Sequence, residues 1–164
     1  MKVQRFYIIG AVVFVFLAAL ALTALGGKAD LDEVRTASEG LQSVEDAEAA
    51  GYVNMNVDAC VASPEGAMGY HYVNFDLVDL DLDPTEPEIM VFIPDSDSSL
   101  RLGAVEYAVP IEAWDAVNEG PPSLLGQALN PNPELGLYVL HAWLYEDNPS
   151  GVFVDWNPAV TCEA

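Results

Sequence analysis

GLYVLHAWLYE, residues 136–146, is the stretch of the sequence that decides the fold. Aliphatic and aromatic side chains fill most of its positions, and His141 lies among them. Turn-forming residues stand on both sides, with NPNP before the run and DNPSG after it. An apolar run rich in aromatic and branched residues between two turns is typical of a β-strand. We therefore predict a strand here.

Similar runs on both sides of this stretch predict further strands. Before them, Leu31, Val34, Leu41 and Val44 recur with roughly helical spacing. This spacing predicts an amphipathic helix over residues 30–50, with Gly40 as a point where it kinks or breaks. A helix followed by mainly antiparallel strands predicts an α+β domain. The further predicted strands are residues 68–75, 88–93, 100–109 and 152–156, and residues 110–117 are predicted as a helical turn.

The N-terminus contains a long apolar run, residues 6–25 (FYIIGAVVFVFLAALALTAL), which carries no charge. A helix of about 20 residues matches a hydrocarbon core of roughly 30 Å. Lys2 and Arg5 precede the run and favour a cytoplasmic N-terminus. Residues 1–28 are therefore interpreted as a transmembrane anchor or a cleaved signal peptide, and the length of the run favours the anchor. Residues 29–164 form the predicted extracytoplasmic domain, on the external face of the cell membrane or secreted.

The charge of this external part is strongly acidic. All 26 acidic residues follow Lys28, and only Arg35 and Arg101 oppose them, which gives a net charge of 2 − 26 = −24. Such a surface repels nucleic acid, so we expect no nucleic-acid partner. The acids are spread along the chain, which favours adaptation to concentrated salt, because salt screens their mutual repulsion. A surface that binds cations is the competing interpretation.

The chain has two cysteines, Cys60 and Cys162. Both lie on the predicted external side, where disulfides persist. No second cysteine or histidine stands at metal-ligand spacing from either one, so free thiols or metal ligands are the less favoured alternative. We therefore expect a disulfide that joins the C-terminus to the start of the domain.

Four segments of the chain carry a resemblance. They are GAMGYH at residues 66–71, AVEYAVP at 104–110, LHAW at 140–143 and NPSGVFVDWNP at 148–158. Together they resemble a family of small secreted microbial proteins with no established activity. The resemblance covers about residues 45–163, including both cysteines, and it implies an exported globular domain without implying a mechanism. The acidity and the N-terminal apolar run depart from the pattern of that family.

The most distinctive residues for chemistry are the only two histidines, His71 and His141, each inside a predicted strand. Glu106 lies inside a third strand, between Val105 and Tyr107. If these strands are neighbours, two imidazoles and one carboxylate converge as a metal site that suits iron or zinc. In the competing interpretation each histidine is structural and Glu106 pairs with Arg101 or a tyrosine. No HExxH spacing supports the metal site.

Two functions therefore stay open. The first is a membrane-tethered or secreted protein with a binding or envelope role and a salt-adapted surface. The second is a metal-binding protein or metal-dependent enzyme that uses His71, Glu106 and His141, with a divalent transition metal as its cofactor. The sequence contains no serine-nucleophile elbow, P-loop or dinucleotide-binding turn. The expected partners are the membrane, if the N-terminal helix is kept, and a divalent cation.

Overall fold

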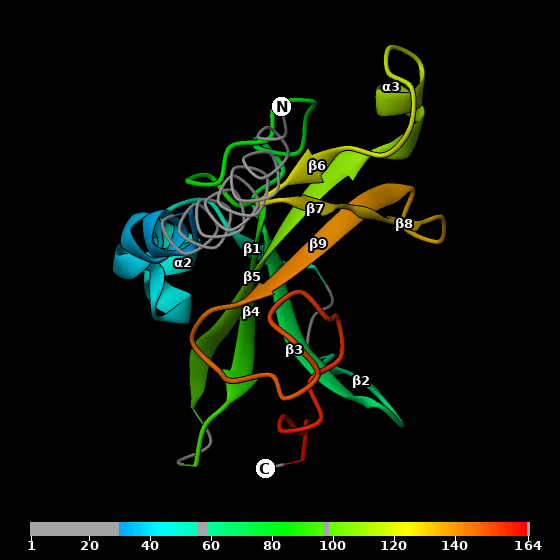
Figure 1. Cartoon of the computed structure of the whole chain (residues 1–164). Helices are drawn as coiled ribbons and strands as arrows, with labels where there is room; N and C mark the ends of the chain where they lie inside the picture. The colour runs from blue at the N-terminus through cyan, green and yellow to red at the C-terminus, as the bar shows by residue number, and fades with distance from the viewer. Residues whose placement is uncertain (1–29, 56–58, 97–98, 164) are drawn as a thin grey trace, which may run out of the picture.

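The computed structural model describes residues 30–55, 59–96 and 99–163 (Figure 1). The predicted N-terminal membrane segment and the boundary at residue 28 lie outside these residues. Across the described ranges, no helix is long and apolar enough to span a lipid bilayer.

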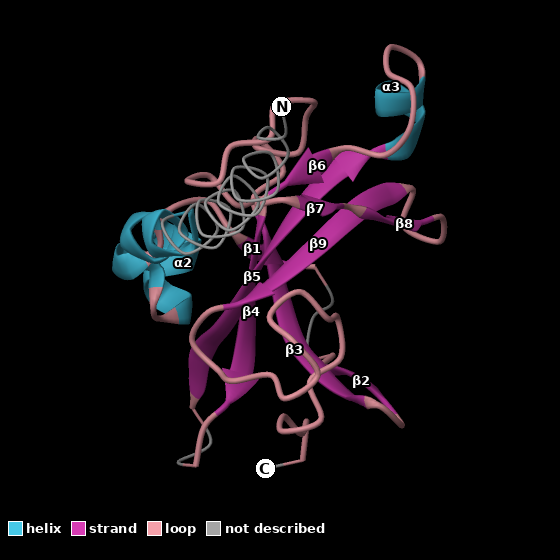
Figure 2. Ribbon diagram, in the orientation of Figure 1, coloured by secondary structure: helices cyan, strands magenta, loops and turns pink. Residues whose placement is uncertain are grey.

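The described part of the chain is built on an antiparallel sheet (Figure 2). Its strands run in the order β1-β3-β4-β5-β9-β8, and β2 pairs with β3 off this path. Few helices accompany the sheet, so the prediction of an α+β fold with a mainly antiparallel sheet is confirmed. The strands are β1 (Val53–Asn54), β2 (Val61–Ser63), β3 (Gly66–Val73), β4 (Ile89–Pro94), β5 (Leu100–Pro110), β8 (Asn130–Asn132) and β9 (Leu137–Trp143).

Four of the predicted strands correspond to the central strands β3, β4, β5 and β9. The β4–β5 turn is closed by a hydrogen bond from the Asp95 backbone nitrogen to the Ser99 carbonyl, 2.8 Å long. The predicted helical turn is α3 (Ile111–Asp115). Between α3 and β8 the chain forms a small hairpin, β6 (Ser123–Leu124) with β7 (Gln127–Ala128), which the sequence did not predict.

The prediction of a strand over residues 152–156 is wrong. This part of the chain has turns and bends, and the nearest ladder contact is an isolated bridge between Ala67 and Asn157. The alternation of Val152 and Val154 resembles a strand, yet both side chains are exposed. The Val154 carbonyl accepts hydrogen bonds from side chains instead of a neighbouring strand, so the segment stays irregular.

The predicted single helix over residues 30–50 is divided. Residues 30–37 are helical, a short 3₁₀ turn η1 (Glu39–Leu41) follows, and α2 (Val44–Ala49) begins after the capping residue Ser43. The interruption coincides with Gly40, the expected breaking point. Buried Ser38 fixes the end of the first helix, because its hydroxyl donates to the Val34 carbonyl and contacts the Tyr145 hydroxyl at 2.7 Å.

The sheet has two faces that differ in what covers them. We call the face packed against residues 30–37 and α2 the helix face, and the opposite face the site face. Val34 and Ala47 pack on the helix face with Phe92, Val105 and Tyr107. Because side chains alternate along a strand, the same strands direct other residues to the site face. These include Val73, Ile89, Val91, Ala104, Ala108, Val139 and Trp143.

The C-terminal segment, residues 147–163, lies against the site face and runs from orange to red in Figure 1. The Trp143 backbone nitrogen donates to the Val152 carbonyl at 2.9 Å. Cys162 forms a disulfide with Cys60, with 5.7 Å between their Cα atoms, so the expected disulfide is confirmed. The site face is therefore covered by irregular chain that is tied covalently near its end.

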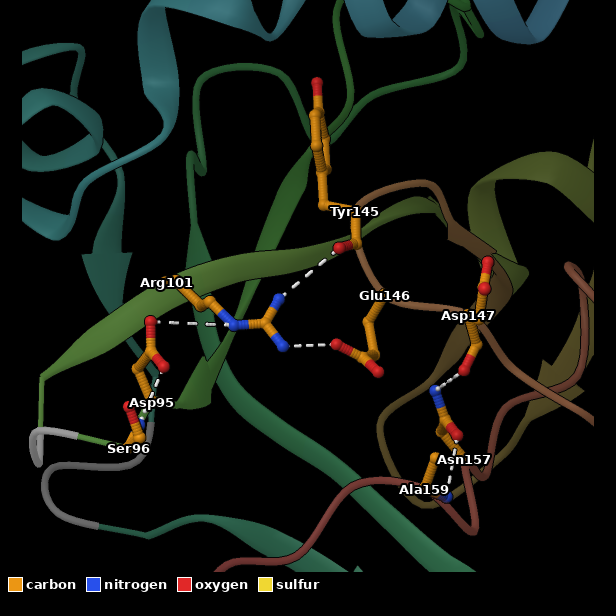
Figure 3. A network of polar contacts seen from close by, with 8 residues as sticks. All are labelled: Asp95, Ser96, Arg101, Tyr145, Glu146, Asp147, Asn157 and Ala159. Atoms are coloured by element: carbon orange, nitrogen blue, oxygen red, sulfur yellow. Dashed lines mark hydrogen bonds and ion pairs between the residues drawn. The ribbon is translucent and has the colours of Figure 1, made fainter.

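Arg101 lies near the start of β5 and contacts three other residues, as Figure 3 shows. Its guanidinium forms an ion pair with Glu146, lies 3.8 Å from Asp95, and donates to the Tyr145 carbonyl at 3.3 Å. In the same view, Asn157 donates to the Asp147 carbonyl at 3.2 Å within the C-terminal segment. The Arg101 guanidinium is therefore engaged away from Glu106, so one of the two partners that the competing interpretation offered for Glu106 does not apply.

Candidate metal centre

The three predicted ligand residues lie on three strands and point to one face. Glu106 on β5 stands opposite His141 on β9 and opposite Ile89 on β4. His71 on β3 stands opposite Val91, which lies two residues further along β4 than Ile89. The Glu106 carboxylate therefore lies beside one imidazole and reaches diagonally across β4 to the other. Neighbouring side chains on one face of a sheet are close enough for such contacts.

The side chains converge closely. His141 Nδ1 lies 3.3 Å from Glu106 Oε1, and His71 Nε2 lies 3.5 Å from Glu106 Oε2. The two imidazole rings meet edge-on, with 5.7 Å between their centroids. One ligand atom from each of the three residues can be chosen so that all lie within 4.8 Å of one another. The arrangement thus meets the geometric condition that the metal-site hypothesis requires.

Burial shapes the charges of the three groups. All are almost fully buried, and burial lowers the pKa of His71 to about 3, with His141 adding to the effect. Burial also raises the pKa of Glu106, although His141 opposes this. For His141, burial lowers the pKa, but Glu106 and Asp155 together raise it above its usual value. His71 is therefore neutral, whereas the neighbouring Glu106 and Asp155 carboxylates favour the charged form of His141 and raise its pKa.

His141 is the least satisfied side chain of the cluster. Both of its ring nitrogens are buried and lack a hydrogen-bond partner among residues 30–55, 59–96 and 99–163. Its contact with Glu106 is short enough for a hydrogen bond but does not have the required geometry. A buried polar atom without a partner costs about 1–3 kcal/mol. An ion that accepts a lone pair from this ring would remove part of that cost.

Asp155 is a fourth member of the site that the sequence did not single out. Its Oδ1 lies 3.6 Å from His141 Nδ1, is buried, and has no hydrogen-bond partner in the part of the chain that the structure describes. With 26 acids in the chain, and a predicted strand over residues 152–156 that gave Asp155 no special place, no signal separated Asp155 from the others. Only the folded C-terminal segment brings it to His141.

The backbone on both sides of Asp155 is held in place by side chains. Trp143 Nε1 donates to the Val154 carbonyl at 2.8 Å. Asn148 Nδ2 donates to the Val154 carbonyl at 3.0 Å and to the Trp156 carbonyl at 3.1 Å. Both residues that flank Asp155 are therefore anchored, which fixes where its carboxylate can reach.

A cavity of about 320 Å³ opens beside the cluster. His71, Glu106, His141 and Asp155 all contribute to its lining. The remaining wall is mostly apolar and comes from strands β2, β3, β4 and β9, from the end of β1, from β8 and the turn that follows it, and from the C-terminal segment. The four polar side chains can therefore be reached by a small molecule in spite of their burial.

No family model, curated protein or solved structure matches this chain. The resemblance to small secreted microbial proteins therefore stays a prediction. The site is argued from its own geometry alone.

Proposed function

We propose that the protein binds one divalent transition metal ion, zinc or iron(II), through His71, Glu106 and His141. The single observation that supports this most strongly is the state of His141. Its two ring nitrogens are buried without hydrogen-bond partners in the described ranges, while Nδ1 faces the Glu106 carboxylate. Because buried polar groups are almost always satisfied, this ring needs a further partner.

The donor set favours a transition metal over calcium or magnesium. Two imidazoles with one carboxylate suit zinc and iron(II), whereas calcium and magnesium prefer oxygen donors. Metal–donor bonds of about 2.0–2.1 Å place neighbouring donors of a tetrahedral ion roughly 3.3–3.4 Å apart. The observed separations of 3.3 Å and 3.5 Å from Glu106 to the two histidines agree with this spacing. The ligand nitrogens of the two histidines lie within 4.8 Å of one another, so they would move closer together around an ion.

Asp155 would act as a positioning residue in this proposal. Residues around the ligands of a metal position those ligands and tune the ion, and Asp155 Oδ1 lies 3.6 Å from His141 Nδ1, the nitrogen that faces Glu106. Once Nδ1 holds the metal it has no proton to donate, so the Asp155 carboxylate would act on the ion through its charge. Three protein ligands leave at least one coordination position for water or another molecule. The bound metal would supply Lewis-acid chemistry there, and the protein residues would hold it and limit water to the cavity.

Metal analysis of the full-length protein tests the proposal. After exhaustive chelation, the protein is titrated with zinc, and bound metal is measured by mass spectrometry. We expect one ion per chain in the wild type and none in His141→Ala or Glu106→Gln. Glu88→Gln is the matched control, because Glu88 is a second glutamate with 1 % exposure that lies outside this cluster and should not alter binding. A wild type without metal, or a metal that survives in His141→Ala, would refute the proposal.

The role of Asp155 is tested separately with Asp155→Asn. We expect the stoichiometry to stay at one ion while the affinity falls about tenfold to a hundredfold, as for other residues that orient a ligand. Asp147→Asn serves as the control, because Asp147 is an exposed acid of the same C-terminal segment. Equal affinity in the two variants would exclude a positioning role.

We also propose that the domain works outside the cytoplasm, as a binding or envelope protein held at the membrane or secreted. The Cys60–Cys162 disulfide supports this location, because such bonds persist in oxidising compartments. Protease added to intact cells should digest the domain, and carbonate extraction should separate an anchored form from a released one. A domain that becomes accessible only after lysis would contradict the external location.

A further inference from the structure

We propose that the cavity beside the metal holds a compact, uncharged molecule with an apolar body, whose nitrogen or oxygen lone pair fills the open coordination position. This inference rests on the proposed metal site and goes beyond it by naming a ligand class. It follows from the shape of the cavity, the chemistry of its wall and the sign of its charges.

The position of the cavity is the first argument. The same space of about 320 Å³ is lined by His71, Glu106, His141 and Asp155. A molecule that occupies it therefore lies next to the ion. Pockets of about 300–1,000 Å³ are the size that holds small organic ligands. A ligand the size of a substituted aromatic ring fits this space.

The wall of the cavity supplies the apolar contact. Met68 comes from β3, Leu137 and Val139 from β9, and Trp156 from the C-terminal segment. Met68, Leu137 and Trp156 are only half-buried, so the wall still presents apolar surface to solvent. Covering this surface with a ligand removes it from water, which favours binding in proportion to the area covered.

The charges around the cavity exclude an anion. Its acidic lining residues are Glu106, Glu134 and Asp155, and no lysine or arginine of the described ranges lines it. Arg35 pairs with Asp32, and Arg101 is occupied by Glu146 and Asp95. Glu106 and Asp155 balance the two positive charges of a divalent ion, and Glu134 adds a further negative charge. A carboxylate or phosphate ligand would therefore meet no net positive charge and no basic residue to hold it. An ammonium ion has no lone pair for the metal, which leaves an uncharged donor.

The cobalt(II) form of the full-length protein allows a direct test, because the visible absorption of cobalt changes when a ligand binds it. The probes are 4-phenylimidazole, imidazole and benzoate. We expect 4-phenylimidazole to bind about tenfold or more tightly than imidazole, because the phenyl ring contacts the apolar wall. Benzoate carries the same ring with a negative charge and should leave the spectrum unchanged at concentrations where 4-phenylimidazole saturates it.

A wall variant separates this inference from the metal site itself. Leu137→Ala should reduce 4-phenylimidazole affinity severalfold and leave imidazole affinity unchanged. Val117→Ala is the control, because Val117 is 70 % exposed and does not line the cavity. Cobalt binding with equal affinity for both imidazoles would overturn the ligand inference while the metal site stands. A preference for benzoate would also overturn it, and a failure to bind cobalt would overturn both proposals.

Discussion

The two faces of the central sheet use the same strands for different purposes. On β5, Val105 and Tyr107 pack into the helix face, while Glu106 between them points to the site face. The helix face is covered by helical residues through apolar packing. The site face is covered by the irregular C-terminal segment, which a disulfide holds in place, and it borders a cavity. Alternation thus lets one strand stabilise the fold on one side and present a buried carboxylate on the other.

The two faces also differ in the groups that surround a buried carboxylate. On the site face, Glu106 lies between two imidazoles. Glu88 lies next to the helix-face residues Tyr52 and Tyr107, and the Ala108 backbone nitrogen donates to it at 3.1 Å. Burial raises the pKa of Glu88 to about 8. Glu88 is therefore tolerated as a neutral acid, whereas Glu106 has charged or chargeable partners.

The largest expected effect concerns the covalent tie on the site face. Replacing both cysteines in Cys60→Ser/Cys162→Ser opens a loop with a sequence separation of 102 residues. The chain-entropy model values a loop of this size at roughly 4.7 kcal/mol, and we expect a loss of unfolding free energy of about that size in urea titrations. Hydrogen exchange should show faster opening of residues 147–163 than of the helices. An unchanged urea midpoint would show that the hydrogen bonds of the C-terminal segment suffice.

On the helix face, the corresponding test is Phe92→Ala. Phe92 has no exposed surface and packs edge-on against Tyr72, with 5.2 Å between ring centroids. We expect a loss of about 3–5 kcal/mol, measured by urea unfolding, because the substitution leaves a cavity in the core. Val154→Ala is the control on the site-face cover, since Val154 is exposed, and it should change stability by about 0.5 kcal/mol or less. A similar loss in both variants would mean that the two covers do not differ.

The central sheet could be predicted from the sequence because its strands carry continuous aromatic and branched runs. The break at Gly40 was also visible, since glycine weakens a helix interior. The strands of two or three residues could not be predicted, because so few positions show no periodicity. Val152 and Val154 led to a strand prediction that was wrong. Their alternation was real, but the side chains of Trp143 and Asn148 donate hydrogen bonds to the Val154 carbonyl.

The candidate site was predictable to the extent that its residue types are rare. The chain has only two histidines, so their places in strands stood out, and Glu106 stood out as an acid between Val105 and Tyr107. Alternation gave the faces within each strand, but neither the order of the strands nor a face common to all three residues followed from any local pattern. Asp155 could not be found, because tertiary anchoring of the C-terminal segment determines its position.

The third prediction concerns how ionisation of Glu88, a buried carboxyl near the helix face, changes the free energy of unfolding. Its pKa is about 8 in the folded protein and about 4.3 when unfolded, so its stabilising contribution is complete below pH about 4.3 and is lost as the pH rises towards 8. Glu88→Gln stays neutral and should be less sensitive to pH over this range. Urea unfolding from pH 5 to pH 8.5 should show the wild type losing stability relative to the variant. Parallel curves would show that Glu88 titrates normally.

The smallest expected effect concerns the exposed acids, which are distributed unequally over the two covers. Residues 30–49 contain seven acids and one arginine, whereas residues 147–163 contain three acids and a disulfide-bonded cysteine. Exposed acids in the first group include Glu33, Glu45 and Glu48. Like charges repel within the Debye length, which falls from about 10 Å at 0.1 M salt to about 3 Å at 1 M. The helices should therefore gain more from salt than the C-terminal segment.

Two measurements test this expectation. The melting temperature of the full-length protein should rise by a few degrees between 0.1 M and 1 M KCl, and hydrogen exchange should slow more in residues 30–49 than in residues 147–163. Choline chloride is the control, since it screens charge without offering a metal cation, and it should act like KCl if screening is the cause. A response to potassium that choline does not reproduce would point to specific cation binding by the acids. A melting temperature that does not change with either salt would refute the salt-adapted surface.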